Sequence, residues 1–254
     1  MEDSMKVIGQ GLDNFQSALK QGGSSLEEFI RENYASKWLS DELVAAMQIR
    51  TTFVQAALGF LADEGLLNIE KVMLSILTDP LAHDIEHTPT INYKGHRYVT
   101  THSMIYAKFL ACSNPNIKGI YVDSPNIRLE LESPSNIQRG KYLADFSQID
   151  VELRRNRSIT LDDYLNDSAR VKKILDEDFE KIKNFFERMI QTAVAAVASK
   201  SKTELDFLEV ALEVPEIPFP SFRKDQVMAK YGARDFEEKC GENEKSQFYW
   251  ITGL

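Results

Sequence analysis

Two segments in the middle of the chain carry chemically useful side chains at alternating positions. Residues 124–132 read Ser-Pro-Asn-Ile-Arg-Leu-Glu-Leu-Glu, and residues 143–153 read Leu-Ala-Asp-Phe-Ser-Gln-Ile-Asp-Val-Glu-Leu. Successive side chains of a β-strand point to opposite faces. We therefore expect two adjacent strands with one apolar face and one polar face, the latter carrying Arg128, Glu130, Glu132, Phe146, Gln148, Asp150 and Glu152.

The residue types on this polar face suit a nucleotide. Arginine makes bidentate contacts with phosphate, and Phe146 offers a ring on which a base can stack. The loop between the strands carries Arg139 and Lys141, which could fold over a triphosphate. The alternation fits the solvent-exposed face of an ordinary antiparallel sheet equally well. The sequence contains no glycine-rich phosphate loop, so side chains would have to hold any phosphates.

The two segments resemble motif 2 of class II aminoacyl-tRNA synthetases of the aspartyl/asparaginyl branch. In that motif an Arg-x-Glu strand, a loop and a Glu-Phe-Thr-Gln-(Ile/Leu)-Asp/Glu strand recur, and this chain has Arg128-Leu-Glu130 and Asp145-Phe-Ser-Gln-Ile-Asp150. With residues 78–80, 101–108 and 248–252 included, the chain most closely resembles the free-standing archaeal asparagine synthetase that is related to asparaginyl-tRNA synthetase. The resemblance runs from Val44 to the carboxyl end.

The resemblance implies an ATP site with a role for each matched residue. Arg128 would be the catalytic residue and would contact the α-phosphate and the activated carboxyl group. Glu130 would bind the adenine amino group, Phe146 would stack on the adenine, and Arg139 would contact the γ-phosphate. Such a site needs no general base, because the substrate carboxylate attacks the α-phosphorus while the protein positions the groups and neutralises charge.

The resemblance also implies an amino-acid site. Gln148 and Asp150 would hold the α-amino group and carboxylate region, and His102 would line the pocket. Ser103 and Lys108 fall where aspartyl enzymes carry Ser-Pro-Gln-x-x-Lys, whose lysine binds the side-chain carboxylate of aspartate. A buried ammonium is stabilised by a carboxylate and left unpaired by a neutral amide, so Lys108 favours aspartate. Spacing alone is typical of a surface lysine on an amphipathic helix.

The surrounding elements predict an α+β fold, with a class II synthetase-like antiparallel sheet flanked by helices and a helical insertion. We expect an N-terminal helical extension over residues 1–40 and a partial catalytic domain over 41–254, including a helical segment over 160–200. Apolar spacing and a capping box at Thr160 and Asp163 predict helices at 41–64, 104–111, 161–200 and 224–230. Alternation predicts strands at 72–77, 97–101, 120–122, 127–131, 146–153 and 247–252.

The chain departs from the family pattern at its carboxyl end. The later acidic strand and motif 3 have no counterpart before Leu254, so we expect a fragment, one piece of a split protein, or a pseudoenzyme. ATP and Mg²⁺ would be the cofactors, with the Mg²⁺ ligands not present in this chain. His83 and His87 have helical metal-ligand spacing, but they fall in an expected loop where that spacing loses its meaning. We therefore predict no metal site.

These observations lead to three functional hypotheses. The first is ATP-dependent, AMP-forming activation of aspartate, with ammonia as the acceptor that gives asparagine. The second is the catalytic part of an aspartyl- or asparaginyl-tRNA synthetase, with tRNA as acceptor, and the third is a non-catalytic synthetase-like binding or regulatory protein. A net charge of -9, two cysteines and the lack of a long apolar run predict a cytoplasmic protein without membrane association. The helix over 41–64 predicts a homodimer.

Overall fold

The computed structural model describes residues 40–77, 88–128, 145–155, 157–232, 236–243 and 247–253. The predicted helical extension over residues 1–40 lies outside the described residues except for Ser40. The chain divides into two compact units, one formed by residues 58–189 and the other by residues 1–57 and 190–254. The predicted site falls within the first unit.

The unit of residues 58–189 contains a three-stranded sheet with the order β1-β5-β6. Strand β5 (Gly119–Ile127) pairs antiparallel with β6 (Asp145–Leu153) over its whole length, and β1 (Leu67–Asn68) pairs parallel with its beginning. Ile120 and Val122 of β5 have no exposed surface. The antiparallel pair at the centre of the predicted fold is therefore present.

Strand β5 joins the strand predicted at 120–122 to the first residue of the strand predicted at 127–131, of which residues 129–131 lie outside the described residues. It runs without a break through Pro125 and ends at Ile127. Residues 125 and 127 direct their N–H positions to the same edge of a strand, and the amide of Ile127 donates to Thr101 O at 2.8 Å, away from β6. The N–H that proline lacks would thus point away from β6, so Pro125 removes no bond of the β5–β6 ladder.

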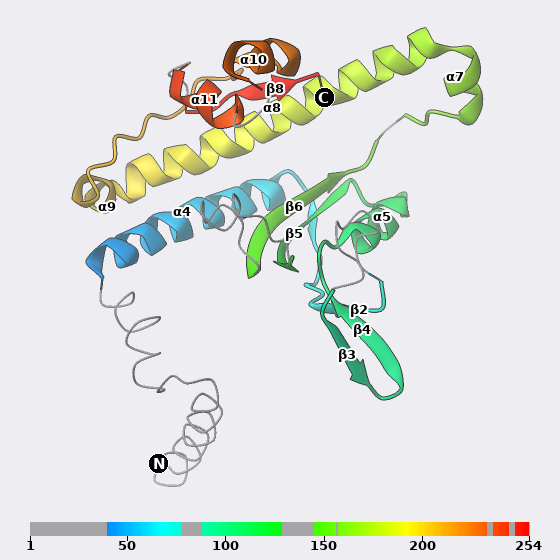
Figure 1. Ribbon diagram of the computed structural model, residues 1–254, viewed down its shortest axis with the longest axis horizontal. Helices are drawn as coiled ribbons and strands as arrows, with labels where there is room; N and C mark the ends of the chain where they lie inside the picture. Colours follow the sequence, from blue (N-terminus) through cyan, green and yellow to red (C-terminus); the bar gives the residue numbers. More distant parts are fainter. Residues whose placement is uncertain are drawn as a thin grey trace. The chain divides into compact units, whose positions relative to one another are not determined.

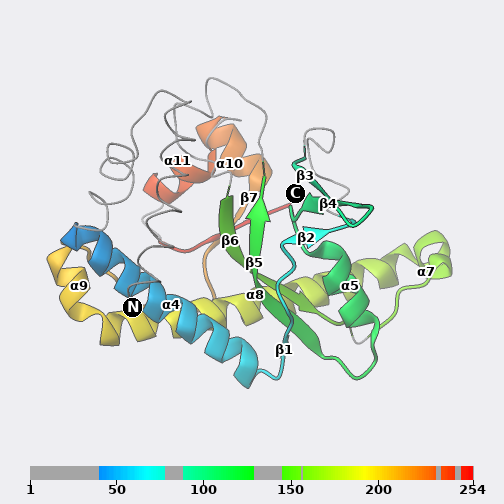
Figure 2. The same ribbon diagram turned by 90° about the horizontal axis from the view of Figure 1, so that it is seen from below.

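A second sheet in this unit has the order β2-β4-β3, and helix α5 follows its strand β4 in the sequence. Its strands are β2 (Leu74–Ser75), β3 (Thr90–Tyr93) and β4 (His96–Thr100), so the strand predicted over 72–77 is only two residues long and β3 is additional. Lys94 and Gly95, both with positive φ, form the two-residue turn of the β3–β4 hairpin. Helix α5 (Ile105–Ser113) packs against β5 and β6, as both views show (Figures 1 and 2).

The helical region predicted over 161–200 consists of two helices, α7 (Leu161–Asn166) and α8 (Ser168–Lys200). The predicted capping box is confirmed: Asp163 N donates to Thr160 Oγ1 at 3.1 Å, and Thr160 N donates to Asp163 Oδ2 at 2.8 Å. The break occurs at Asp167, whose backbone is not helical and whose carboxylate accepts from Arg170 N at 2.9 Å. Asp167 thereby caps the start of α8.

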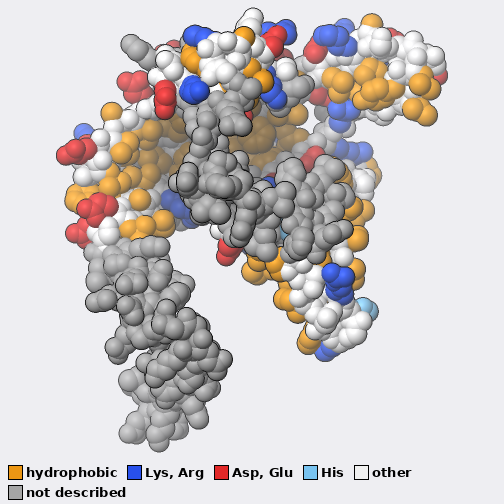
Figure 3. All heavy atoms as spheres, in the orientation of Figure 1, with side chains coloured by type: hydrophobic (Ala, Val, Ile, Leu, Met, Phe, Trp, Pro, Cys, Tyr) orange, Lys and Arg blue, Asp and Glu red, His pale blue; other side chains and the backbone are white. Residues whose placement is uncertain are grey.

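Helix α7 presents apolar side chains to solvent, visible as the hydrophobic cluster over α7 in Figure 3. Leu161 and Leu165 are 74% and 73% exposed. A six-residue helix without a buried apolar face lacks the packing that usually stabilises short helices. The capping box is therefore a main local source of stability for α7.

The other unit contains a two-stranded parallel sheet of β7 (Ser221–Arg223) and β8 (Trp250–Thr252). Strand β8 is shorter than the strand predicted over 247–252. The helix predicted over 224–230 is confirmed as α10 (Lys224–Tyr231), whereas α9 (Lys202–Phe207) and α11 (Phe236–Asn243) are short helices that the sequence pattern did not predict. The buried apolar side chains of the unit include those of Ala193, Val197, Leu205, Phe219 and Val227.

Helix α4 (Asp41–Asp63) confirms the helix predicted over 41–64. Among the described helices it is the one whose length and composition would allow it to cross a membrane, with a mean hydropathy of 1.2 over its most apolar stretch. One such helix is weak support for a membrane segment, because core helices of soluble proteins also meet these two criteria. Val44 and Met47 on this helix are 41% and 38% exposed.

Candidate active site

The register of β5 and β6 places the predicted polar side chains on one face. Asn126 lies opposite Phe146, Ser124 opposite Gln148, and Val122 opposite Asp150. Directly paired residues of an antiparallel ladder share a face, and Arg128 continues the alternation of Ser124 and Asn126. The structure therefore brings Arg128, Phe146, Gln148 and Asp150 to the same side of the sheet, as the sequence predicts.

Arg128 and Phe146 form the first group of the site. The guanidinium carbon of Arg128 lies 5.3 Å from the centre of the Phe146 ring, within the range of a cation–π contact. Arg128 Nε donates to His102 O at 2.9 Å. This bond uses one donor of the guanidinium fork and holds the side chain, and the geometry leaves the terminal nitrogens suited to bidentate contact with an anion.

Lys108, Asp150 and Gln148 form the second group. Lys108 Nζ from α5 lies 3.4 Å from Asp150 Oδ1, and the two side chains are only 12% and 13% exposed. Gln148 Nε2 donates to the same oxygen at 2.9 Å. The sequence suggested separate contacts of Lys108 and Asp150 with a substrate, and the structure adds that the two side chains pair with each other.

Glu152 adds a further carboxylate beside this pair. The sequence analysis placed Glu152 on the polar face but assigned it no role. Burial raises the pKa of the Glu152 carboxyl, the charge of Lys108 lowers it, and the charge of Asp150 raises it again, with burial the largest effect. Glu152 thus takes up a proton more readily than an exposed glutamate. The site gathers two acidic side chains around one ammonium.

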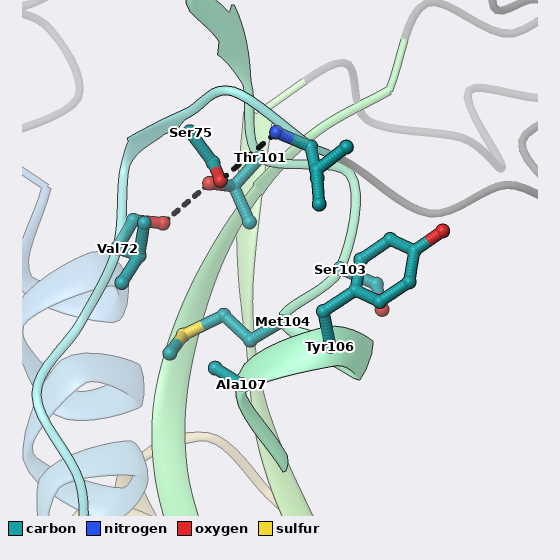
Figure 4. Close-up of a pocket in the computed structure, with 8 residues that line it drawn as sticks. Val72, Ser75, Thr101, Ser103, Met104, Tyr106 and Ala107 are labelled. Carbon is teal, nitrogen blue, oxygen red and sulfur yellow. Dashed lines mark hydrogen bonds between the residues drawn. The ribbon is translucent and has the colours of Figure 1, made fainter. Parts of the chain in front are cut away.

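His102 and Ser103 lie just before helix α5, which starts at Ile105. Ser103 Oγ accepts from the amide of Ile105 at 3.1 Å, and Ser103 helps to line a small cavity of about 70 Å³ between the segment around β2 and helix α5. Figure 4 shows this cavity, with Val72, Thr101 and Tyr106 among the residues around it. Ser103 thus lies two residues before the helix that carries Lys108, whose N-cap is Met104. His102 is buried, and its backbone oxygen holds Arg128.

Several buried polar atoms on or near this face have no hydrogen-bond partner in the part of the chain that the structure describes. They are Thr100 Oγ1, Ser124 Oγ, Asn126 Oδ1 and Asp150 Oδ2. Ser124 and Asn126 have no exposed surface. These burials exclude the alternative of an ordinary solvent-exposed sheet face. Buried polar atoms are normally satisfied, so their concentration here is typical of a site that binds a polar ligand.

The sequence pattern did not single out Ser124 and Asn126 as site residues. The available signal was their spacing, because both precede Arg128 by an even number of residues. The strands predicted at 120–122 and 127–131, however, left both residues in the gap between them. Glu130 and Arg139, by contrast, were predicted to bind ATP and lie outside the described residues.

The described parts of the chain contain no candidate metal site. No three His, Cys, Asp or Glu side chains come together there in an arrangement that could hold a metal ion. His83 and His87, with their metal-ligand spacing, lie outside the described residues.

Comparison with known proteins gives distant relatives of one kind. No protein-family model matches the chain. An aspartate–tRNA(Asp/Asn) ligase from Archaeoglobus fulgidus is 23% identical over 198 residues, which cover 78% of this chain and 38% of the relative. An aspartate–tRNA(Asp) ligase from Thermococcus kodakarensis is 22% identical over 202 residues, 80% of this chain and 40% of the relative. The chain thus spans about two fifths of the length of these relatives.

Solved structures agree on the fold. The asparaginyl-tRNA synthetase of Pyrococcus horikoshii in complex with asparaginyl-adenylate aligns with a TM-score of 0.54 at 14% identity, over 92% of this chain and 45% of that one. The Entamoeba histolytica enzyme with the same ligand gives a TM-score of 0.55 at 13% identity, over 91% and 43%. The chain is therefore a distant homologue of the aspartate–tRNA ligases and has the α+β fold of a class II aminoacyl-tRNA synthetase domain of the aspartyl/asparaginyl type.

Proposed function

We propose that this chain provides the amino-acid and α-phosphate half of a ligase site that activates aspartate with ATP. One observation carries the proposal: a single sheet face presents the Arg128–Phe146 pair and, four residues further along β6, Asp150 in its buried pair with Lys108 of α5. The first pair suits a phosphate beside a stacked base, and the second suits the charged groups of a small amino acid. The distant homology to aspartate–tRNA ligases supports this assignment.

The proposed reaction would use both groups of side chains. A carboxylate oxygen of aspartate attacks the α-phosphorus of ATP, the bond to the β-phosphate oxygen breaks, and pyrophosphate leaves. The products are aspartyl-adenylate and pyrophosphate. Arg128 would neutralise the negative charge that accumulates around the α-phosphate, Phe146 would hold the adenine, and Lys108 and Asp150 would orient the amino acid. Glu130 and Arg139 remain proposed ATP contacts on the basis of the resemblance.

Aspartate is the proposed substrate because of Lys108. Its ammonium is largely removed from water in the protein, and a carboxylate beside it regains the Coulomb energy that a neutral amide cannot supply. In the described residues Lys108 forms an ion pair with Asp150 Oδ1, at 3.4 Å, and its charge also acts on the carboxyl of Glu152. Because burial makes Glu152 take up a proton more readily than an exposed glutamate, the ammonium would still attract a carboxylate of the substrate more strongly than the amide of asparagine.

Magnesium enters the proposal only as a cofactor of ATP. The described residues contain no group of side chains that fits a divalent cation, so these residues do not account for magnesium binding and we assign no step to it.

Two acceptors are compatible with an activated aspartate. We propose ammonia, which would give asparagine, on the basis of the resemblance to the free-standing asparagine synthetase. The names of the curated relatives favour tRNA instead, because both are aspartate–tRNA ligases.

We further propose a cytoplasmic homodimer in which α4 packs against a second copy, since Val44 and Met47 on this apolar helix are exposed.

Aspartate-dependent exchange of pyrophosphate into ATP tests the proposal. The expected result is exchange with L-aspartate that exceeds exchange with L-asparagine by at least tenfold. Adding ammonia or tRNA to the same reaction then identifies the acceptor by its product, asparagine or aspartyl-tRNA. No exchange and no ligand-induced rise in the melting temperature with ATP and aspartate together would overturn the enzymatic assignment and favour a non-catalytic binding protein.

A further inference from the structure

Thr101 is bonded to two parts of the chain that are far from each other in the sequence. Its amide donates to Met73 O at 3.1 Å, and its carbonyl oxygen accepts from the amide of Ile127 at 2.8 Å. Its hydroxyl donates to Val72 O, a bond that is drawn in Figure 4. Thr101 is buried, with 3% of its surface exposed. Its amide, carbonyl and hydroxyl groups together join residues 72–73 to the end of β5.

The same place in the chain holds the side chain of Arg128. Arg128 Nε donates to His102 O at 2.9 Å, and Arg128 directly follows Ile127, whose amide donates to Thr101 O. Two consecutive residues at the end of β5 therefore bind two consecutive carbonyl groups. Because Nε lies at the base of the guanidinium fork, the position of the His102 carbonyl sets the direction in which the terminal nitrogens of Arg128 point.

The hydroxyl of Thr101 adds a second attachment point beside the backbone bond. Strand β4 ends at Thr100 and helix α5 begins at Ile105, so Thr101 is the first residue of the connection between them. The amide bond to Met73 O holds this connection at one point. The hydroxyl bond to Val72 O holds it at another and restricts its rotation about the first. The hydroxyl thereby restricts the neighbouring His102 carbonyl as well.

We propose that Thr101 is a positioning residue for Arg128. Its hydroxyl fixes the connection whose carbonyl groups hold the guanidinium, and it has no assigned contact with a substrate. The inference rests on the proposed function for the identity of the anion that Arg128 meets, whereas the positioning itself requires no ligand. Charge neutralisation depends strongly on geometry, because a misplacement of about 1 Å can cost about a hundredfold in rate.

Hydrogen exchange of the Arg128 Nε–H proton, measured by NMR on the full chain without ligand, tests the positioning directly. The signal is assigned by its absence in Arg128→Lys. Thr101→Val removes the hydroxyl and keeps the shape, and it should speed exchange of this proton about tenfold or more, because the bond to His102 O opens more often. Thr101→Ser keeps the hydroxyl and should stay within about threefold of the wild type.

Thr252→Val is the matched control for this measurement. Thr252 Oγ1 also donates to a distant backbone carbonyl, Phe222 O, at 3.4 Å, but Thr252 belongs to the other compact unit. Thr252→Val should leave both the exchange of the Arg128 proton and the pyrophosphate exchange unchanged.

A double-mutant cycle in pyrophosphate exchange separates positioning from a general effect on stability. Thr101→Val should lower kcat about tenfold with little change in the KM for aspartate, the pattern of an interaction that acts in the transition state. Arg128→Lys lacks the Nε donor. On that background, Thr101→Val should change kcat by less than about twofold, because both substitutions remove the same interaction.

Several results would overturn the proposal. One is an Arg128 proton whose exchange is unchanged by Thr101→Val, or as fast in the wild type as in free arginine. Another is an equal loss of kcat on both backgrounds, because Thr101 would then act only on the fold. If Thr101→Val does not fold, Thr101→Cys takes its place with the same expected directions, since a thiol donates only weakly. Wild-type protein without pyrophosphate exchange overturns the proposed function instead, and the NMR measurement still decides whether Thr101 positions Arg128.

Discussion

Removing one partner of the Lys108–Asp150 pair is the sharpest perturbation of the site. Lys108→Met deletes the ammonium and keeps most of the apolar stem, so Asp150 Oδ1 is left with the amide of Gln148 alone. At 3.4 Å and an effective dielectric constant of about 20, the direct attraction is about 5 kcal/mol. The lost hydration of both charges offsets most of it. We expect Lys108→Met to lower the free energy of unfolding by about 2–4 kcal/mol, because it leaves a carboxylate with little solvent exposure.

A double-mutant cycle with Asp150→Asn isolates the interaction. The double variant should regain part of the stability lost by Lys108→Met, with a coupling energy of about 1–3 kcal/mol in urea titrations. Lys172→Met is the matched control, because its pair with Asp176 is largely exposed and should contribute under about 0.5 kcal/mol. A coupling energy indistinguishable from zero would refute the argument that burial makes this pair strong.

The same variant tests the ligand role of Lys108. Lys108→Met should weaken aspartate binding at least tenfold more than ATP binding, measured by titration of each ligand separately. Equal weakening of both would contradict a specific contact with the aspartate side chain. If the variant binds aspartate and asparagine with comparable affinity, this result supports the proposal that Lys108 selects aspartate.

Four further predictions follow from single elements. Arg128→Lys keeps the charge but loses the planar fork, so pyrophosphate exchange should fall about a hundredfold while the melting curve is nearly unchanged; retained exchange would contradict its role. Glu152→Gln should stabilise the chain at pH 7. The pKa of Glu152 is raised in the folded chain, so the folded chain retains a proton that the unfolded chain has already released. The contribution of Glu152 to the free energy of unfolding therefore falls as the pH rises past the ordinary pKa of glutamate. The gain should vanish in urea titrations at pH 3. Thr160→Ala should cost about 1 kcal/mol through loss of the cap, seen as faster amide exchange over α7. Met47→Glu should shift the sedimentation coefficient from dimer to monomer; an unchanged value would contradict dimerisation through α4.

Local patterns were enough to identify most elements of the fold. The apolar spacing of α4, the alternation of β6 and the Thr160–Asp163 capping box each depend on neighbours within a few residues, and each is confirmed. The predictions failed where a local signal was overridden or missing. The strands predicted at 120–122 and 127–131 left residues 123–126 as a gap, yet β5 continues through them because the missing N–H of Pro125 faces away from β6. The helix over 161–200 is broken because Asp167 caps α8.

The sequence alone also determined which side chains share the polar face, since strand alternation fixes that for Arg128, Phe146, Gln148 and Asp150. It could not determine which of them touch. The pairing of Lys108 with Asp150 joins a helix to a strand 42 positions later, and the packing of α5 on the sheet decides it. Only the tertiary structure shows that Ser124 and Asn126 are buried with unused acceptors, because burial depends on what distant segments cover. Alternation assigns a residue to a face, and the packing of distant segments decides whether that face is buried or exposed.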